Sequence, residues 1–181
     1  LLKKKNQKKL INRSFLIDRS GKIKSHYDKI HMFDVKINKK ETYKESDSFK
    51  PGKKIILTKI QNIKLGFTIC YDLRFPSLFR TLAKEGAEII LMPAAFTVPT
   101  GRDHWEILVR ARAIENNAFL IATNMCGTHH TNRKTFGHSI LVNPWGKILK
   151  KALNKPTIMN TKIDLKEVVK SRKKIPSLTH G

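Results

Sequence analysis

Residues 66–76 read Gly-Phe-Thr-Ile-Cys-Tyr-Asp-Leu-Arg-Phe-Pro, an apolar run that ends at Cys70 and is soon followed by Pro76. This pattern predicts a buried strand that delivers Cys70 to a sharp turn, with a helix just beyond. A nucleophile elbow has that geometry, here with sulfur in place of oxygen. Near a helix N-terminus, the dipole and the backbone N–H groups favour a thiolate and can hold an oxyanion. A small buried core cysteine fits the same residues equally well.

Strands and helices alternate on both sides of this stretch. The predicted strands are 54–59, 63–70, 88–93, 119–123 and 138–143, and the predicted helices are 77–86 and 103–117. Gly86 is expected to stop the first helix and Asp103 to cap the second. Residues 15–18 and 23–24 are expected to pair as a hairpin around Gly21. The alternation over 54–123 predicts an α/β layered fold.

The composition bounds the class of protein. A chain of 181 residues suffices for one domain with a real core, so 1–181 is taken as a single domain. No run approaches the ~18 apolar residues of a membrane span, which excludes a transmembrane protein. Two cysteines without a regular framework favour a reducing, cytoplasmic environment.

The net charge of +23 comes from 37 basic and 14 acidic residues, and 28 of the basic residues are Lys. The excess is confined to residues 1–64 and 134–181. A nucleic-acid binder more typically interleaves Arg and aromatic residues along one surface. The distribution therefore indicates solvated surface and disfavours a nucleic-acid partner.

Lys29 lies upstream of the cysteine, in the segment Tyr27–Asp34. Beside Cys70, its ammonium group would lower the pKa of the thiol and stabilise a tetrahedral oxyanion. Glu45 follows Lys29 by sixteen residues and could orient it. The spacing alone leaves a solvent-exposed surface lysine equally open.

Several segments, in this order and spacing, resemble the nitrilase superfamily of carbon–nitrogen hydrolases, from about Leu10 to the end of the chain. They are Lys29-Ile30-His31, residues 70–76, Pro93–Thr97, His104-Trp105-Glu106, residues 110–115, Gly137-His138-Ser139 and Asn143-Pro144-Trp145-Gly146. The run after Cys70 is similar to the amidase branch. Residues 95–97, 100–101 and 104–106 are most similar to the deaminated-glutathione amidases, with the ω-amidases as close relatives.

The resemblance implies a nitrilase-type α-β-β-α sandwich that forms a homodimer through one helical face. It also implies a cysteine-dependent amidohydrolase that cleaves a small linear amide to a carboxylate and ammonia through a thioester. The amide would be deaminated-glutathione-like, or the ω-amide of a 2-oxo or dicarboxylic acid. Cys70 would be the nucleophile, Lys29 and the backbone N–H of Tyr71 would stabilise the oxyanion, and Glu45 would hold the lysine and the water. No metal or organic cofactor is implied.

Three further residues are candidates for substrate binding: Arg74, Thr97 and His104. A guanidinium group binds carboxylates bidentately, so Arg74 could hold a substrate carboxylate. Pairing of Arg74 with Glu106 or Glu115 is an equally good alternative.

The segment Cys-Gly-Thr-His-His over residues 126–130 invites a metal site, but no second cluster at a recognised spacing completes four ligands, so no metal site is predicted. His138, which follows Gly137, is expected to be structural.

The general base of the family is a glutamate upstream of the lysine, yet the first glutamate here is Glu41. The opening strands and helices of the fold are missing too, and the chain does not begin with Met. We therefore expect an N-terminally truncated fragment that is poorly stable and inactive by itself, although its complete parent would be an amidase. The alternative is a non-catalytic truncated or basic interaction protein of the same fold.

Overall fold

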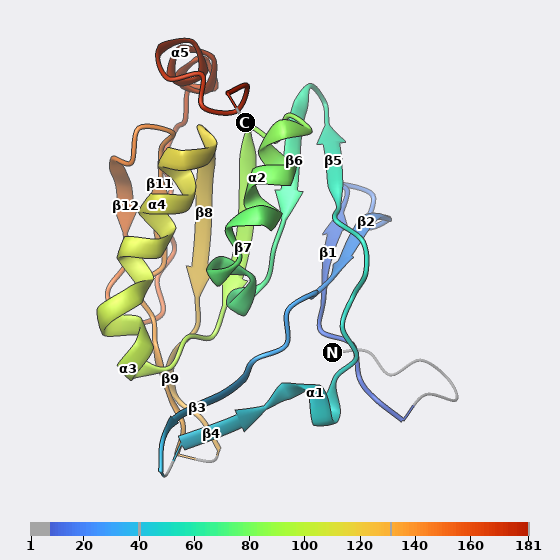
Figure 1. Ribbon diagram of the computed structural model, residues 1–181, viewed down its shortest axis with the longest axis vertical. Coiled ribbons are helices and arrows are strands. Elements are labelled where there is room, and N and C mark those ends of the chain that lie inside the picture. Colours follow the sequence, from blue (N-terminus) through green and yellow to red (C-terminus); the bar gives the residue numbers. More distant parts are fainter. Residues whose placement is uncertain (1–7, 40, 131, 181) are drawn as a thin grey trace. The chain divides into compact units, whose positions relative to one another are not determined.

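A computed structural model describes residues 8–39, 41–130 and 132–180 (Figure 1). The chain divides into two compact units, the first ending at Ile56 and the second beginning at Leu57.

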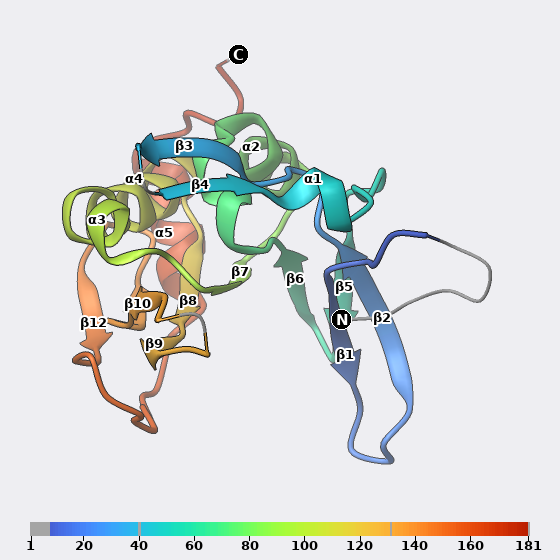
Figure 2. The same cartoon turned by 90° about the horizontal axis from the view of Figure 1, so that it is seen from below.

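The first unit consists of two β-hairpins and one helical turn. Its elements are β1 (Arg13–Ile17), β2 (Ile23–Asp28), β3 (Asp34–Asn38), β4 (Glu41–Lys44) and α1 (Glu45–Ser48). β1 pairs antiparallel with β2, and β3 with β4 (Figure 2). The predicted hairpin around Gly21 is confirmed and is longer than predicted, whereas the β3–β4 hairpin was not predicted.

Backbone and polar contacts hold much of the first unit together. Among its described residues, Ile11 and Tyr27 are the only buried apolar side chains. Leu10 forms an isolated parallel bridge with Phe49, which joins the start of the unit to the end of α1. The carboxylate of Asp34 accepts a hydrogen bond from the N–H of Ser46 at 2.9 Å, and this bond lowers the pKa of Asp34.

The second unit is built on a six-stranded sheet in the order β12-β11-β8-β7-β6-β5 (Figure 1). The strands are β5 (Leu57–Ile60), β6 (Ile63–Phe67), β7 (Ile89–Ala94), β8 (Phe119–Asn124), β11 (Ile140–Val142) and β12 (Ile148–Lys151). The central strands β6, β7 and β8 are parallel, and the outer pairings are antiparallel. A separate two-stranded sheet pairs β9 (Cys126–Thr128) with β10 (Lys134–Phe136).

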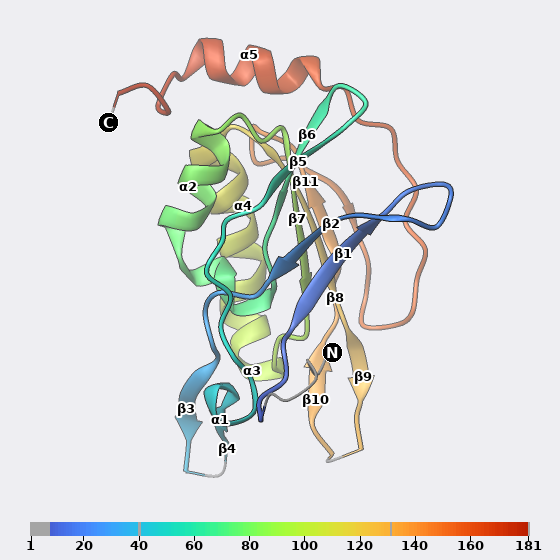
Figure 3. The ribbon, with the colours of Figure 1, turned by 90° about the vertical axis from the view of Figure 1, so that its right-hand side faces the viewer.

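Two crossover helices connect the parallel strands, as this topology requires. They are α2 (Pro76–Lys84) and α4 (Glu106–Asn116), and they pack together on one face of the sheet (Figure 3). The remaining helices are the short α3 (Val98–Thr100) and the C-terminal α5 (Lys166–Lys174). The mixed α/β fold predicted from the alternation is thereby confirmed.

The core of the second unit lies between this sheet and the two helices. Large side chains fill it, among them Phe67, Phe79, Trp105 and Phe119, each at most 2% exposed. Gly66 allows β6 to approach α2 closely, because a Cβ atom there would lie 3.0 Å from a methyl group of Leu82.

The two crossover helices begin in different ways. α2 begins at Pro76 and is followed by Gly86 at φ +99°, so the predicted start and stop are both confirmed. The prediction that Asp103 caps the next helix is wrong. A turn of π-helix, Gly101–Trp105, precedes α4, so Asp103 lies inside that turn and caps nothing.

Within the described residues, every helix is too short or too polar to cross a membrane.

Candidate functional site

Cys70 sits on a strained turn three residues after the end of strand β6. β6 ends at Phe67, and Thr68 continues along β7 by donating its N–H and its hydroxyl to the carbonyl of Leu91 at 3.0 and 3.1 Å. Ile69 is extended, but Cys70 has φ +49°, in the left-handed region. A residue with a Cβ atom pays roughly 1–2 kcal/mol for that conformation. The predicted sharp turn at Cys70 is confirmed.

The helix predicted beyond this turn begins at Pro76, as predicted, and not at Cys70 itself. A five-residue 3₁₀ turn, η1 (Cys70–Arg74), separates the cysteine from α2. The break falls before Pro76 because the residue that precedes a proline is pushed out of the helical region, and Phe75 accordingly has φ −113° and ψ 90°. Cys70 therefore lies at the start of η1 and not at the N-terminus of an α-helix.

Asp72 holds the first half of this turn. It is fully buried, and its carboxylate accepts a hydrogen bond from the N–H of Ile69 at 2.8 Å. Its own N–H donates to the carbonyl of Ile69 at 3.1 Å, and its carbonyl accepts from the N–H of Phe75 at 3.0 Å. These bonds close the backbone around Cys70 on both sides.

Arg112 of α4 holds the second half. Its Nε donates to the carbonyl of Leu73 at 2.9 Å, its Nη1 pairs with Glu115 at 2.9 Å, and its guanidinium lies over the ring of Phe79. Only 6% of Arg112 is exposed, so this cation is buried, and its hydrogen bond to Leu73 and ion pair with Glu115 compensate for the burial. Neither Asp72 nor Arg112 was predicted to hold this turn. Asp72 could have been found from the sequence, because it places a carboxylate two residues after Cys70.

The carboxyl ends of β6, β7 and β8 meet at one edge of the sheet because these strands are parallel, and ligands of open α/β sheets bind outside that edge. Cys70 follows β6, Thr97 follows β7 and Asn124 ends β8. The side-chain amide of Asn124 accepts from the N–H of Phe96 at 2.9 Å and donates to the carbonyl of Gly137 at 2.7 Å. Asn124, missed in the sequence analysis, thus fixes the loop after β7.

Arg74 and His104, both predicted as substrate contacts, lie together. The Nη2 of Arg74 is 3.1 Å from Nδ1 of His104, and its guanidinium lies over the ring of Phe96. A guanidinium group only donates hydrogen bonds, so Arg74 is the donor in this contact. The two carboxylates considered as alternative partners pair elsewhere, Glu106 with Lys151 and Glu115 with Arg112.

Thr97 is only 2% exposed. Its hydroxyl lies 2.9 Å from that of Thr100, and its carbonyl accepts from the N–H of Gly101 at 2.8 Å. These contacts fix the turn that leads to Trp105, whose ring packs edge-on against Phe96. The side chain of Thr97 faces the protein interior.

Lys29 and Glu45 form an ion pair in the first unit. Lys29 is 2% exposed, so the surface-lysine alternative is excluded. The carboxylate of Glu45 also accepts from the N–H of Phe33 at 2.6 Å and from the side-chain amide of Asn12 at 3.5 Å. A buried ammonium group needs such a partner, because an unpaired charge is costly to bury.

The backbone of Lys29 is fixed on both sides. Its N–H donates to the carbonyl of Asn12 at 2.9 Å, and its carbonyl accepts from the N–H of Gly52 at 2.8 Å. A Cβ atom on Gly52 would overlap the carbonyl of Asp28, so only glycine fits there. The Pro51-Gly52 pair was a visible turn signal for this contact, whereas nothing in the sequence indicated Asn12.

The predicted site residues therefore form two groups. Lys29 and Glu45 belong to the first unit, and Cys70, Tyr71, Arg74, Thr97 and His104 to the second.

The histidines considered as metal ligands or structural residues have other contacts. Among the described residues, no group of three or more His, Cys, Asp or Glu side chains could hold a metal ion. Nε2 of His129 lies 2.8 Å from the hydroxyl of Thr135. His138 stacks on Phe136, and its carbonyl accepts from the indole N–H of Trp105 at 2.8 Å, which confirms its structural role.

Comparison with known proteins places this geometry in a family. The sequence pattern of the carbon–nitrogen hydrolases matches residues 1–173. The chain is 45% identical to the deaminated glutathione amidase of Yersinia enterocolitica over 169 residues, which cover 93% of this chain and 59% of that protein. It is 40% identical to the deaminated glutathione amidase of a Synechocystis species, covering 95% of this chain and 64% of the relative. The chain thus spans about three fifths of the length of these curated relatives.

Solved structures agree with the sequence comparison. The NitFhit protein of C. elegans matches with a TM-score of 0.89 at 36% identity, over 96% of this chain and 42% of that one. An amidase mutant from Nesterenkonia sp. AN1 matches with a TM-score of 0.70 at 28% identity, over 80% of this chain and 52% of that one. It shows covalent addition of the acetamide moiety of fluoroacetamide at its active-site cysteine. With its α/β sheet and its elbow at Cys70, this chain belongs to the carbon–nitrogen hydrolase family, within the nitrilase superfamily.

Proposed function

We propose that this chain carries the cysteine and lysine machinery of an amidase that cleaves a small linear amide. The observation that carries the proposal is the strained elbow at Cys70 in a chain of this family. A left-handed residue with a side chain persists only where the surrounding contacts enforce it, and such positions cluster at active sites. Here the enforcing contacts come from Asp72 and Arg112.

In the proposed reaction, the sulfur of Cys70 attacks the amide carbon and forms a C–S bond. The carbonyl oxygen becomes an oxyanion, which Lys29 and the backbone N–H of Tyr71 stabilise. The C–N bond then breaks, the nitrogen takes up a proton and leaves as ammonia, and a thioester remains on Cys70. Water hydrolyses the thioester to the carboxylate and regenerates the thiol. Glu45 holds Lys29 in place, and its carboxylate also accepts hydrogen bonds from the N–H of Phe33 and the side-chain amide of Asn12.

The substrate class we propose is an amide that also carries a carboxylate. Two similar proteins are deaminated glutathione amidases. The guanidinium of Arg74 lies in the unit that holds Cys70, and its neighbours there are an imidazole and a phenyl ring, while Glu106 and Glu115 pair with other cations. A deaminated-glutathione-like amide or an ω-amide of a dicarboxylic acid fits that chemistry.

Turnover needs a general base as well as these groups. No glutamate precedes Lys29 in the sequence, so we propose that the 181-residue chain by itself forms covalent adducts at Cys70 but does not turn over. Release of ammonia from an amide by the purified chain, at an enzyme-like rate, would contradict this part of the proposal.

We also propose that the protein is a homodimer when full length. The outward face of α4 supports this, because Ile107 and Ile114 are 69% and 47% exposed there, and Trp145 is 56% exposed in the second unit. Sedimentation equilibrium tests it: a monomer at high micromolar concentration would contradict it.

The test of the proposed function uses fluoroacetamide, in which a thiolate displaces fluoride to form a thioether. The chain is incubated with the reagent and its two cysteines are quantified by peptide mass spectrometry. We expect the adduct on Cys70 at least tenfold faster than on Cys126, and we expect K29M to remove most of that preference.

Two controls accompany this experiment. C70S must abolish the fast adduct, and the unfolded chain in denaturant must label both cysteines equally. Equal, slow labelling of both cysteines in the folded chain would support the alternative, a non-catalytic protein of the same fold.

A further inference from the structure

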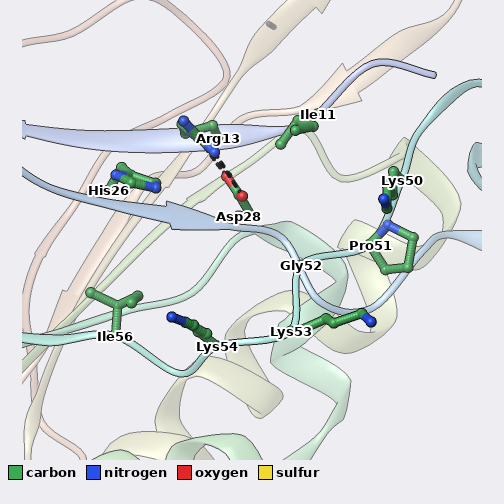
Figure 4. Close-up of a pocket in the computed structure, with 10 residues that line it drawn as sticks. All are labelled: Ile11, Arg13, His26, Asp28, Lys50, Pro51, Gly52, Lys53, Lys54 and Ile56. Carbon is green, nitrogen blue, oxygen red and sulfur yellow. Dashed lines mark hydrogen bonds and ion pairs between the residues drawn. The ribbon is translucent and has the colours of Figure 1, made fainter. Parts of the chain in front are cut away.

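A hollow of about 460 Å³ lies in the first unit, and neither Lys29 nor Glu45 is among the residues that line it. The hairpin β1–β2 forms one side of it and residues 50–56 form the other (Figure 4). The hairpin contributes Arg13, His26 and Asp28, and the opposite segment contributes Lys50, Lys53 and Lys54. Its volume is in the range of small-molecule sites.

The charges of this hollow are not balanced. Asp28 is its only carboxylate, and both of its oxygens accept from Arg13, at 2.5 and 2.8 Å (Figure 4). This bidentate pair raises the pKa of Arg13, and the two charges neutralise each other. In the portions of the chain that the structure describes, no carboxylate pairs with Lys50, Lys53 or Lys54. Three ammonium groups are therefore left around one concave surface, where they raise the local potential.

Backbone hydrogen bonds fix the chain at Lys50 and Gly52. The N–H of Lys50 donates to the carbonyl of Leu10 at 2.9 Å, and the N–H of Gly52 donates to that of Lys29 at 2.8 Å. Pro51, between them, has a restricted φ angle. The position from which the side chain of Lys50 projects is thus set before any ligand arrives, which lowers the entropic cost of binding.

We propose that this hollow binds a small organic phosphate. The guanidinium group of Arg13 could bind a ligand carboxylate bidentately, but it already pairs with Asp28. The groups that remain are ammonium groups, which act as point charges and suit the several oxygens of a phosphate. Ile11, Pro51 and Ile56 are the apolar side chains around the hollow that would contact the organic part of the ligand. This proposal does not depend on the proposed amidase function.

The test is calorimetric titration of the full chain with pyrophosphate and with succinate, at about 0.15 M salt to screen general attraction. The pocket variant K50Q/K53Q/K54Q is compared with a control variant, K150Q/K155Q/K162Q, which removes the same number of charges from exposed positions of the second unit. We expect saturable binding of pyrophosphate, at least tenfold weaker in the pocket variant and less than twofold weaker in the control. Succinate is expected to bind at least tenfold more weakly than pyrophosphate.

Equal weakening in both variants, tight binding of succinate, or no saturable binding of pyrophosphate would each overturn the proposal. The single variant K54Q guards against a folding defect of the triple variant. It should weaken pyrophosphate binding while the amide resonances of β1 and β2 stay in place.

Discussion

The lysine group and the cysteine group are held by different kinds of contact. Lys29 is buried in a unit with little apolar core, and it is kept in place by the carboxylate of Glu45 and by backbone hydrogen bonds to Asn12 and Gly52. Cys70 stands at the edge of a sheet that is packed by large apolar side chains. Lys29 and Glu45 have little apolar packing around them, whereas the side chains that hold the elbow, Asp72 and Arg112, are themselves embedded in a packed core.

The largest effect should come from that core. Phe79→Ala empties a fully buried position under the guanidinium of Arg112, and we expect it to cost about 3–5 kcal/mol. Urea unfolding followed by tryptophan fluorescence reports this unit alone, because Trp105 and Trp145 are the only tryptophans. Ile17→Ala, at a 58% exposed position of the first unit, is the control and should leave that transition unchanged. A loss below about 1 kcal/mol for Phe79→Ala would refute the contribution assigned to the core.

Removing the carboxylate of Glu45 should affect the first unit nearly as strongly. Glu45→Gln leaves the ammonium of Lys29 buried without its counter-charge, and breaking such a pair costs about 3 kcal/mol or more. Amide hydrogen exchange in β1 and β2 measures the loss, while the fluorescence transition of the second unit should not move. The double variant K29M/E45Q should recover part of the stability, and failure to recover would mean that charge burial is not the cause.

The carboxylate of Asp72 offers a sharper test of the elbow. Asp72→Ala leaves the N–H of Ile69 without its acceptor and should cost about 2 kcal/mol. We also expect Cys70 to lose its labelling advantage over Cys126, because the turn is no longer closed. Asp72→Asn keeps an acceptor oxygen and should lose less than half as much stability. If both variants labelled like the parent, Asp72 would not position the cysteine.

Because the backbone is strained at Cys70, glycine should be more stable than alanine there, whereas the opposite order is expected at an ordinary strand position. With φ +49°, Cys70→Gly should be more stable than Cys70→Ala by about 1 kcal/mol. At Ile69, where φ is −137°, alanine should instead be more stable than glycine. Urea midpoints of the four variants decide the matter, and the same order at both positions would remove the argument for strain.

The smallest effect concerns the turn of the β1–β2 hairpin. Hydrogen bonds from the hydroxyl of Ser20 and the N–H of Lys22 lower the pKa of Asp18 to about 2. A lowered pKa means that the carboxylate stabilises the turn at neutral pH, and that this contribution is lost as the pH falls towards about 2. The amide shift of Lys22, followed by NMR against pH, measures it. Ser20→Ala should move the midpoint upwards, and an unchanged midpoint would show that the hydroxyl has no part in it.

The sequence predicted the elements that carry strong local signals. The apolar strands, the Pro76 start and the Gly86 stop of α2 follow from periodicity and from the fixed preferences of proline and glycine. The prediction that Asp103 caps a helix was wrong because a π-helical turn contains this residue. The hydrogen bond from the N–H of Gly101 to the carbonyl of Thr97 holds that turn, which overrides the preference of aspartate for a cap position. The connection between β3 and β4 contains neither glycine nor proline, so this hairpin was not predicted.

For the candidate site, local sequence indicated the cysteine but not the contacts that fix it. The carboxylate of Asp72 is near in sequence, yet Arg112 and Asn124 reach the loops from elements far along the chain. Contacts of that range depend on the tertiary fold, which periodicity does not encode. The pairing of Lys29 with Glu45 came from a resemblance, and the structure supplies the physical reason for it in the burial of the ammonium.

The parallel order of β6, β7 and β8 has a consequence for synthesis on the ribosome. β6 emerges first but gains its neighbour β7 only after α2 has been made, and the carbonyl of Leu73 gains its donor only when Arg112 appears. β6 therefore lacks its parallel partner strand until Ile89–Leu91 have been made, and the turn at Leu73 lacks its donor until Arg112 has been made. Slow pairing of this non-local kind exposes a nascent chain to aggregation. Chaperone dependence during translation, more than stability at equilibrium, should thus limit how much of this protein a cell accumulates.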